Sequence, residues 1–274
     1  MSQLVLDHIY KAYYSNRRMS EARVVLEDVN MYIEQGEFVC LIGPSGCGKT
    51  TMLNLLAGFE KPTKGTVSFN GETVKGPSRE RGVVFQEYSL FPWMSTVDNI
   101  ILALECKRIP EKKRRGIAEE ALDNVGLSDF YDYRPNTLSG GMKQRAAIAR
   151  LLAMDSDVFL MDEPFSALDE QTRRKLDEDL IELWKDKRKT IVFVTHSIDE
   201  AILVSSRIIM LSDTPGKVIG EWKLDADRDR ALTVPENLRL KKEILDRMPK
   251  CACESREEEC SCKNREQRCS CKKE

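Results

Sequence analysis

The chain of 274 residues has no long hydrophobic run and no marked excess of either charge. No apolar run approaches the roughly 18 residues of a membrane-spanning helix, and no basic-then-apolar leader precedes the first motif. We therefore expect a cytosolic protein that reaches a membrane only through a partner. The 43 basic and 45 acidic residues give a net charge of −2, which disfavours a nucleic-acid binder that relies on a uniformly basic surface.

The apolar residues that are present occur in short runs separated by helical stretches. Five runs have the character of buried parallel strands, and their alternation with helices predicts an α/β core. Four further segments, bounded by turn residues, predict short strands of an antiparallel layer, the last closed by an Asn-Gly turn. The parallel runs cover residues 38–42, 83–85, 158–161, 190–195 and 207–211, and the antiparallel segments cover 4–9, 24–26, 29–33 and 66–71.

The order of these segments predicts three parts of the chain. Residues 1–86 and 155–230 would form the α/β core with its antiparallel layer, and residues 87–154 would form a helical subdomain. Residues 231–274 would form a C-terminal extension, which begins with a short amphipathic helix over 235–248 and ends in a cysteine-rich tail. In the helical subdomain the candidate helices cover residues 96–107, 111–125 and 140–154.

A glycine-rich loop follows the first buried strand. Its glycines let backbone N–H groups turn inward around phosphates, and the N-terminus of the next helix adds positive potential. Lys49 would reach the β- and γ-phosphates of a nucleotide, and Thr50 would place its hydroxyl on Mg²⁺. The predicted nucleotide-binding residues of this segment are Gly43, Pro44, Ser45, Gly46, Cys47, Gly48, Lys49, Thr50 and Thr51.

Two adjacent carboxylates end another buried strand. Asp162 can hold Mg²⁺ through water, and Glu163 can polarise a water that attacks the terminal phosphate. A general base must lie near that phosphate, and a strand end beside the phosphate loop meets this condition. Adjacent carboxylates after a strand are a weak signal alone, but their spacing from the motif described next makes it strong.

Residues 138–144, which read Leu-Ser-Gly-Gly-Met-Lys-Gln, lie between the phosphate loop and the acidic strand end. Ser139 and the amides of Gly140 and Gly141 at a helix N-terminus would make an anion site. A solvent-facing helix cap could show the same pattern. With the three motifs in this order, the chain resembles the motor subunit of an ATP-binding-cassette (ABC) transporter, and the resemblance spans about residues 4–222.

The resemblance implies a P-loop NTPase core of the ATP-binding-cassette type, with an antiparallel β subdomain and a helical subdomain. It implies Mg²⁺-dependent ATP hydrolysis at two composite sites in a dimer with a second ATP-binding subunit, which we expect to be an identical chain. It also implies separate transmembrane permease subunits, an indirect link to a solute-binding protein, and a position on the cytoplasmic face of the plasma membrane.

Five further residues match the family pattern. Gln86 resembles the glutamine that contacts Mg²⁺ and the lytic water, and His196 resembles the histidine beside the γ-phosphate. Asp169 resembles the loop aspartate at the dimer seam, Gln144 ends the signature motif, and Tyr13 resembles the aromatic that stacks on adenine. A histidine at a strand end is often structural, and a tyrosine can be a packed surface residue.

The resemblance assigns roles to these residues. Glu163 would be the catalytic base, assisted by His196 and Gln86. Thr50, Gln86 and Asp162 would hold Mg²⁺. The remaining members of the set, Tyr13, Ser139, Gly140, Gly141, Gln144 and Asp169, would contact nucleotide together with the phosphate loop.

The segment 87–100 resembles the nitrate, sulfonate and taurine importer group. Phe91 and Trp93 could floor a groove for a permease helix, or they could pack inside the helical subdomain. The basic stretch 107–115 is more typical of a solvated helix start than of a lipid contact. The alternative function is a soluble ABC ATPase, such as an iron–sulfur assembly ATPase, which would not co-purify with a permease.

The tail repeats a Cys-x-Cys pair three times among charged residues. Such a segment has too little apolar surface to form a core, and its thiolates suit soft metals. The alternatives are an iron–sulfur cluster or other iron site, zinc or another thiophilic metal, and a redox switch or unligated tail. A metal-ordered tail would lie near the dimer seam and restrain it. The candidate ligands are Cys251, Cys253, Cys260, Cys262, Cys269 and Cys271.

Overall fold

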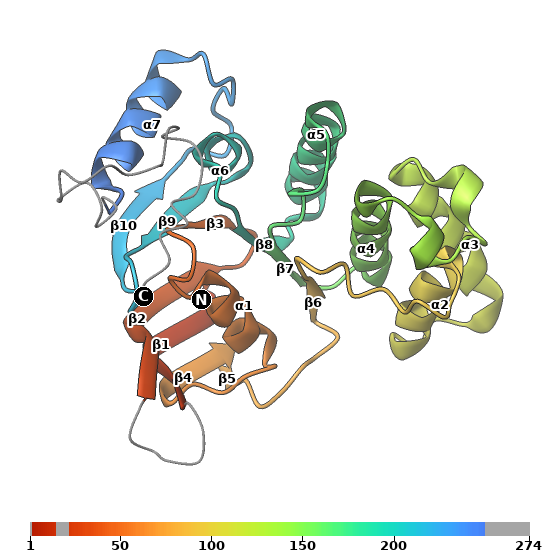
Figure 1. The fold of residues 1–274 in the computed structure, drawn as a ribbon, viewed down its shortest axis with the longest axis horizontal. Helices are drawn as coiled ribbons and strands as arrows, with labels where there is room; N and C mark the ends of the chain where they lie inside the picture. The colour runs from red at the N-terminus through yellow and green to blue at the C-terminus, as the bar shows by residue number, and fades with distance from the viewer. Residues whose placement is uncertain (1, 15–21, 250–274) are drawn as a thin grey trace, which may run out of the picture.

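The computed structural model describes residues 2–14 and 22–249 (Figure 1). Its larger sheet has six strands in the order β10-β9-β3-β8-β7-β6, of which all but β10 are parallel. This confirms the predicted α/β core, since every predicted buried run is one of these strands. The strands are β3 (Phe38–Ile42), β6 (Arg81–Val84), β7 (Val158–Asp162), β8 (Thr190–Val194), β9 (Arg207–Leu211) and β10 (Val218–Lys223).

The smaller sheet is the antiparallel layer, with the order β2-β1-β4-β5. Asn70 and Gly71, with φ of 50° and 83°, form the predicted tight turn between its last two strands. Both residues are in the left-handed region, which hairpin turns of this kind require. The strands are β1 (Ser2–Tyr14), β2 (Ala22–Glu34), β4 (Lys64–Phe69) and β5 (Glu72–Thr73).

One prediction for this layer was wrong. The segments 24–26 and 29–33 are not two strands but parts of β2, which runs through the residues between them. Asp28 and its neighbour on β1, His8, both have positive φ, of 50° and 48°. The imidazole Nδ1 of His8 lies 2.7 Å from Oδ1 of Asp28. The paired strands therefore kink together at an irregularity in the register and continue, where the sequence suggested a break.

The helices cover both faces of the large sheet, and α2, α3 and α4 gather at the end remote from the antiparallel layer (Figure 1). The predicted helices near 96–107, 111–125 and 140–154 are confirmed to within one residue. None of the helices in the described ranges is long and apolar enough to cross a membrane. The division of the chain into subdomains stays a prediction. The helices are α1 (Lys49–Ala57), α2 (Thr96–Cys106), α3 (Glu111–Asn124), α4 (Gly140–Met154), α5 (Glu170–Lys187), α6 (Ile198–Val204) and α7 (Pro235–Arg247), with short 3₁₀ turns at Ser128–Phe130 and Pro135–Thr137.

The alternation of side chains along β3 separates two apolar interiors. Phe38, Cys40 and Ile42 face the interior beneath α4, α5 and α6, whereas Val39 and Leu41 face the interior that the two sheets share with α1. Parallel strands buried on both faces need such continuous apolar runs. The loop between β3 and α1 is thus anchored at both ends by buried segments.

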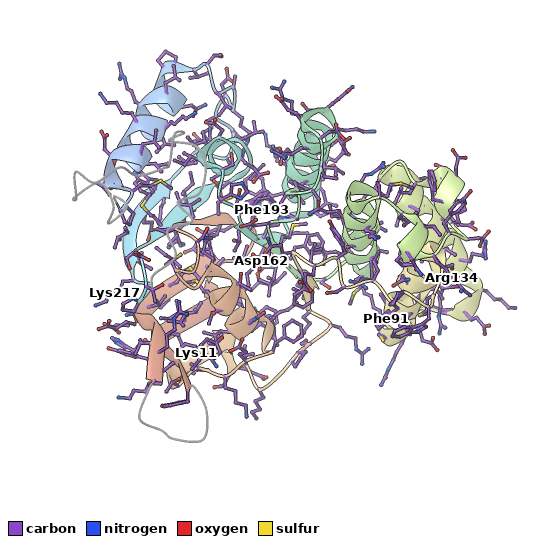
Figure 2. All side chains as sticks on the ribbon, viewed as in Figure 1. Lys11, Phe91, Arg134, Asp162, Phe193 and Lys217 are labelled. Carbon is purple, nitrogen blue, oxygen red and sulfur yellow. The ribbon has the colours of Figure 1, made fainter. Side chains whose placement is uncertain are left out.

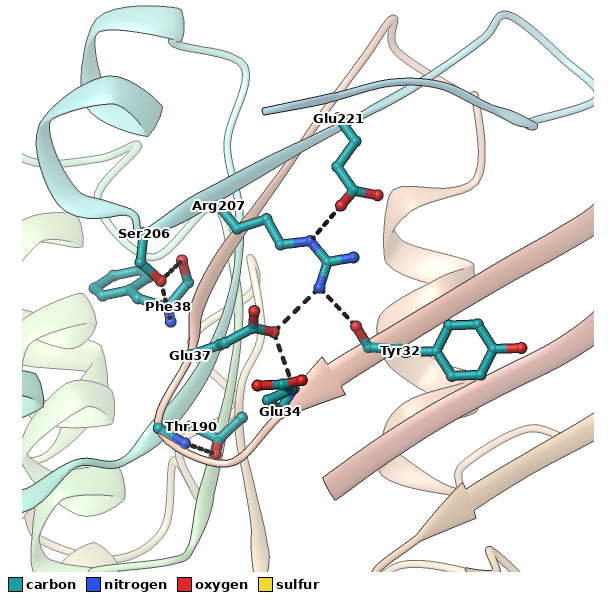
Figure 3. Close-up of polar contacts among 9 residues, drawn as sticks. Tyr32, Glu34, Glu37, Phe38, Thr190, Ser206, Arg207 and Glu221 are labelled. Carbon is teal, nitrogen blue, oxygen red and sulfur yellow. Dashed lines mark hydrogen bonds and ion pairs between the residues drawn. The ribbon is translucent and has the colours of Figure 1, made fainter. Parts of the chain in front are cut away.

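Arg207 on β9 joins the large sheet to β2, the edge strand of the small sheet (Figure 3). Its Nη1 donates to the carbonyl of Tyr32 on β2 at 2.6 Å and to Oε2 of Glu37 at 3.1 Å. Its Nε lies 3.1 Å from Oε1 of Glu221 on β10. The side chain is only 9% exposed, so its partners replace the hydration that burial removes.

Candidate functional site

The loop between β3 and α1 has the backbone of a phosphate cradle. Gly43, Gly46 and Gly48 have φ of 150°, 82° and 100°, a region that L side chains rarely adopt. A Cβ on Gly48 would meet Leu26 Cδ2 at 2.6 Å, so the glycine is also needed for close packing. No side chain in the described part caps the N-terminus of α1. The free amide groups there are a natural anion site.

Lys49 is the cation of this cradle. It is 7% exposed, and its Nζ donates to the carbonyls of Gly43 at 2.7 Å and Pro44 at 2.9 Å. The loop therefore holds the ammonium group beside the cavity described below. Cys47 is buried with its Sγ 3.8 Å from the same Nζ, and burial raises the pKa of this thiol. Only the backbone of Cys47 is available to a nucleotide.

A cavity of about 560 Å³ opens over the loop, and part of the predicted set lines it: Tyr13, Ser45, Gly46, Gly48, Lys49, Thr50, Thr51, Gln86, Asp162 and Glu163. His196 does not line this cavity. Asp162, at the end of β7, lies near the centre of the molecule (Figure 2) and is 5% exposed. Burial raises the pKa of Asp162, and a hydrogen bond from Thr50 opposes the shift. Gln86 and Glu163 line the same cavity.

These donors suit Mg²⁺. The ion prefers oxygen ligands and usually takes one or two carboxylates, with phosphate oxygens and water completing its shell. Thr50 and Asp162 lie close enough for the hydroxyl to affect the pKa of the carboxyl group, and Gln86 lines the same cavity. One carboxylate, one hydroxyl and one amide oxygen beside a phosphate cradle fit the ion.

Glu163 also lines a second, smaller cavity of about 50 Å³, which it shares with His196. Glu163 has a left-handed φ of 45°, and its amide donates to the carbonyl of Val194 at 3.0 Å. His196 Nδ1 lies 3.5 Å from Glu163 Oε2. The strained backbone thus turns the carboxylate away from the strand and toward the histidine, at a position where strain often marks function.

Tyr13 is held at the rim of the cavity by polar contacts. Its hydroxyl donates to Glu60 Oε2 at 2.7 Å and lies 3.4 Å from Thr51 Oγ1. Lys11 Nζ lies 4.9 Å from the ring centroid. The residue is 40% exposed, so it offers an aromatic surface next to the cradle. Arg23 on β2 also lines the cavity; the predictions missed it, since an isolated basic residue in a strand carries no motif.

The signature residues lie elsewhere on the chain. Ser139 caps α4 by accepting a hydrogen bond from the amide of Met142 at 3.3 Å, and Ser139 and Gly140 are exposed. Neither Ser139, Gly140 nor Gly141 lines the cavity over the phosphate loop. Asp169 caps α5, accepting from the amide of Thr172 at 3.0 Å. One chain therefore does not bring its own signature to its own phosphate cradle.

Gln144 differs from its predicted role. It is 1% exposed, and both ends of its amide bind the backbone: Nε2 donates to the carbonyl of Glu163 at 3.2 Å, and Oε1 accepts from the amide of Ala167 at 3.0 Å. Its side chain braces the loop after β7. The resemblance predicts a nucleotide contact for Gln144. The sequence does not reveal that its side chain points inward.

Phe91 and Trp93 lie on the surface, at 36% and 68% exposure, with ring centroids 5.4 Å apart. Asn99 holds their loop, since its Oδ1 accepts from the amide of Phe91 at 2.7 Å and its Nδ2 donates to the carbonyl of Ser95 at 2.8 Å. The alternative of purely internal packing is not favoured. Figure 2 places Phe91 at the end of the molecule formed by α2 and α3.

The six cysteines predicted to bind metal, Cys251, Cys253, Cys260, Cys262, Cys269 and Cys271, lie outside the described residues. Within residues 2–14 and 22–249, no three His, Cys, Asp or Glu side chains gather as a metal site. The three cysteines in the described part are unbridged thiols.

The ABC transporter family model matches residues 26–166. A nitrate import ATP-binding protein of Synechococcus elongatus is 44% identical over 230 residues, which are 81% of this chain and 84% of that protein. A taurine import ATP-binding protein of Jannaschia sp. is 44% identical over 227 residues, 80% of this chain and 85% of that one. A bicarbonate transport ATP-binding protein of Synechocystis sp. is 40% identical, covering 89% and 88%.

A solved dimeric ATP-binding cassette in a post-hydrolysis state, bound to ADP and phosphate, has the same fold. Its TM-score with this chain is 0.75 at 36% sequence identity, and the match covers 81% of this chain and 99% of the solved chain.

Proposed function

The chain belongs to the ABC transporter family, and from this premise we propose that it is the ATP-hydrolysing subunit of an importer for a small anionic or organic solute. The resemblance predicted from its motifs is confirmed. The observation that carries the proposal is the single cavity that joins Lys49, Thr50, Gln86, Asp162 and Glu163. The relatives named for nitrate, taurine and bicarbonate have similar identities, so they support a solute class rather than one solute.

The site residues have separate roles in hydrolysis. The loop amides and Lys49 bind the phosphates, and Tyr13 stacks on the base. Thr50, Gln86 and Asp162 would hold Mg²⁺, which would neutralise charge on the phosphate oxygens. Glu163 accepts a proton from the attacking water, and His196 lies beside it to contact the γ-phosphate. Gln144 keeps the Glu163 loop in place.

The site would be completed by a second copy of the chain. The signature residues Ser139, Gly140 and Gly141 would bind the γ-phosphate held by the partner, with Asp169 near the seam. Two observations support this: the signature residues do not line the cavity over their own phosphate loop, and the chain is similar to a dimeric cassette.

Dimer closure would drive separate permease subunits, docked at Phe91 and Trp93, on the cytoplasmic face of the plasma membrane. A solute-binding protein would act indirectly through the permease. The alternative of a soluble ABC ATPase is not favoured, because the relatives named above are transport proteins. Trp93→Ala should lose co-purification with the permease and keep basal ATP hydrolysis; retained binding would contradict this docking site.

Glu163→Gln tests the hydrolytic role. It should bind ATP, persist as an ATP-bound dimer in light scattering, and hydrolyse at least about 100-fold more slowly, since an amide cannot take the proton. Glu170→Gln, an exposed acid on α5, is the matched control and should hydrolyse normally. Rapid turnover by Glu163→Gln would overturn the assignment.

For the tail, the proposal rests on sequence alone. The three Cys-x-Cys pairs would bind an iron–sulfur cluster or, alternatively, zinc, and regulate the dimer seam. Metal and acid-labile sulfide content of anaerobically purified protein distinguishes the two. A metal-free protein whose transport-coupled activity is unchanged when all six cysteines become serine would reject both.

A further inference from the structure

The segment after β10 folds back onto α6, the helix that begins two residues after His196. In Figure 1 α7 lies beside α6 and β10. The indole Nε1 of Trp222 donates to Glu243 Oε1 at 3.0 Å, and Ile244 is fully buried. Residues 225–248, called here the C-terminal brace, are therefore fixed to the body of the protein.

The brace holds the C-terminal end of α6 through two arginines. The last carbonyl groups of a helix lack partners within the helix and accept readily from cations. Arg228 Nη2 donates to the carbonyl of Ile202. Arg230 Nη1 donates to the carbonyl of Leu203 at 2.7 Å, and its guanidinium lies 5.4 Å from the ring of Trp184.

Asn237, another residue of the brace, fixes Arg228 and the loop around it. Asn237, which is 4% exposed, accepts from Arg228 Nη1 through its Oδ1 at 3.0 Å. Its Nδ2 donates to the carbonyls of Asp229 at 3.0 Å and Ala231 at 2.9 Å. The contacts to α6 therefore come from an ordered loop.

The same brace holds the N-terminal end of α6. Lys241 Nζ on α7 lies 2.7 Å from Oδ1 and 2.8 Å from Oδ2 of Asp199. Asp199 is in the first turn of α6, three residues after His196. The helix is thus held at both ends by cations from one segment, although that segment does not line the cavity over the phosphate loop.

The start of α6 is part of the hydrolytic site. Ser197 N donates to Thr195 Oγ1 at 3.0 Å, and Ser197 Oγ accepts from Glu200 N at 3.2 Å. Glu200, from the first turn of α6, joins His196 and Glu163 in the wall of a cavity of about 50 Å³. A shift of α6 would therefore move His196 relative to Glu163.

We propose that Arg228, Arg230 and Lys241 are positioning residues for His196, and that the C-terminal brace sets the distance between His196 and Glu163. The inference rests on the proposed role of His196. The brace does not touch the phosphate loop, so loosening it lowers kcat and leaves KM for ATP unchanged. Positioning of a reacting pair affects rate through orientation, and small displacements are costly.

The test is a charge-exchange series at the pair that is accessible to solvent. Lys241→Asp and Asp199→Lys should each lower kcat about two- to fivefold, the size that an exposed ion pair supports, with unchanged KM. The double variant Asp199→Lys with Lys241→Asp should recover kcat. The matched control is Lys242→Asp: Lys242 has the same charge on the same helix, and no ion pair with it is found among the described residues. It should hydrolyse ATP like the parent chain.

The second arm repeats Lys241→Asp in a His196→Ala background, with phosphate release followed at high enzyme concentration. There the second substitution should have no further effect, whereas a merely structural role would lower both backgrounds equally. Equal effects in both backgrounds, or unchanged kcat in the single variants, would overturn the inference. Full activity of His196→Ala alone would instead refute the proposed role of the histidine.

Discussion

The phosphate loop and the signature end of α4 are the two anion sites that we propose, but one is enclosed and the other is open. Lys49 and Asp162 are 7% and 5% exposed and meet in one cavity. Ser139 and Gly140 are exposed, and the hydroxyl of Ser139 bonds only within its own helix start among the described residues. On this proposal, the chain encloses one half of its site and exposes the other half.

The difference between the two sites indicates how the energy of ATP binding could be used. A prebuilt cradle binds nucleotide with little reorganisation. If a second chain brings the phosphate to the open signature, as we propose, closure of the dimer and contact with the phosphate happen together. This is how ATP could be linked to movement of a permease.

The largest expected effect comes from breaking both halves separately. Lys49→Ala should lower hydrolysis about 100- to 1,000-fold, because it removes a preorganised cation from the phosphates. Ser139→Glu should be similarly inactive, since its carboxylate would repel the partner's phosphate. Mixing the two variants should restore a measurable fraction of activity, because one of the two composite sites in a mixed dimer is intact.

The control for this mixing is each variant mixed with itself, with circular dichroism confirming the fold. If mixed protein stays inactive while mixed dimers are detected by mass spectrometry, the two halves do not complement one another across chains, and the comparison fails.

Arg207 tests how much the contacts between the two sheets stabilise the enclosed half of the site. Arg207→Met should lower the free energy of unfolding by about 3 kcal/mol, because Glu37 would lose its cation in a mostly buried setting. The matched control is Lys217→Met, which removes an exposed ion pair between the residue before β10 and Glu27 on β2; it should cost at most about 1 kcal/mol. Urea unfolding gives both values, and equal losses would show that the Arg207 network is not special.

Asp177 on α5 has the opposite effect to Arg207: it is a buried polar group that destabilises the interior behind the site. It is 2% exposed, and burial together with the nearby Glu200 raises its pKa to about 8. The folded protein then keeps a proton that the unfolded chain loses near the ordinary value of 3.8, so stability falls as pH rises between 3.8 and about 8.

Asp177→Asn should remove this pH dependence. At pH above about 8 the variant should be more stable than the parent chain by on the order of 1–3 kcal/mol, and near pH 5 the two should be similar. Thermal unfolding across this range gives the difference. A constant difference at every pH would mean that the carboxyl of Asp177 does not carry the shift.

The sequence could predict the features that depend on neighbouring residues, but not those that depend on distant contacts. The phosphate loop, Asp162 and Glu163 were predictable because their chemistry depends on neighbours in the chain, with glycines for left-handed backbone and carboxylates at a strand end. The α/β core followed from short apolar runs for the same local reason.

The residues that were missed depend on contacts distant in sequence. The kink at His8 and Asp28 needs two strands to meet, and it turned two predicted strands into one. The inward position of Gln144 depends on the loop at Ala167. The ion pair between Lys241 and Asp199 joins residues 42 positions apart in the sequence. None of these contacts leaves a periodic or motif signal.

The smallest effect, on stability, gives the finest test of the open half. Ser139→Ala removes the cap of α4 and should cost about 1 kcal/mol. Ser95→Ala is the matched control, because Ser95 caps α2 in the same way, accepting from the amide of Asp98 at 3.1 Å. The two variants should lose similar stability in urea, yet only Ser139→Ala should also lose hydrolysis, by about tenfold or more, since only its hydroxyl would face a phosphate. Equal hydrolysis by both would reduce Ser139 to a helix cap, and the open half would then rest on the backbone of Gly140 and Gly141 alone.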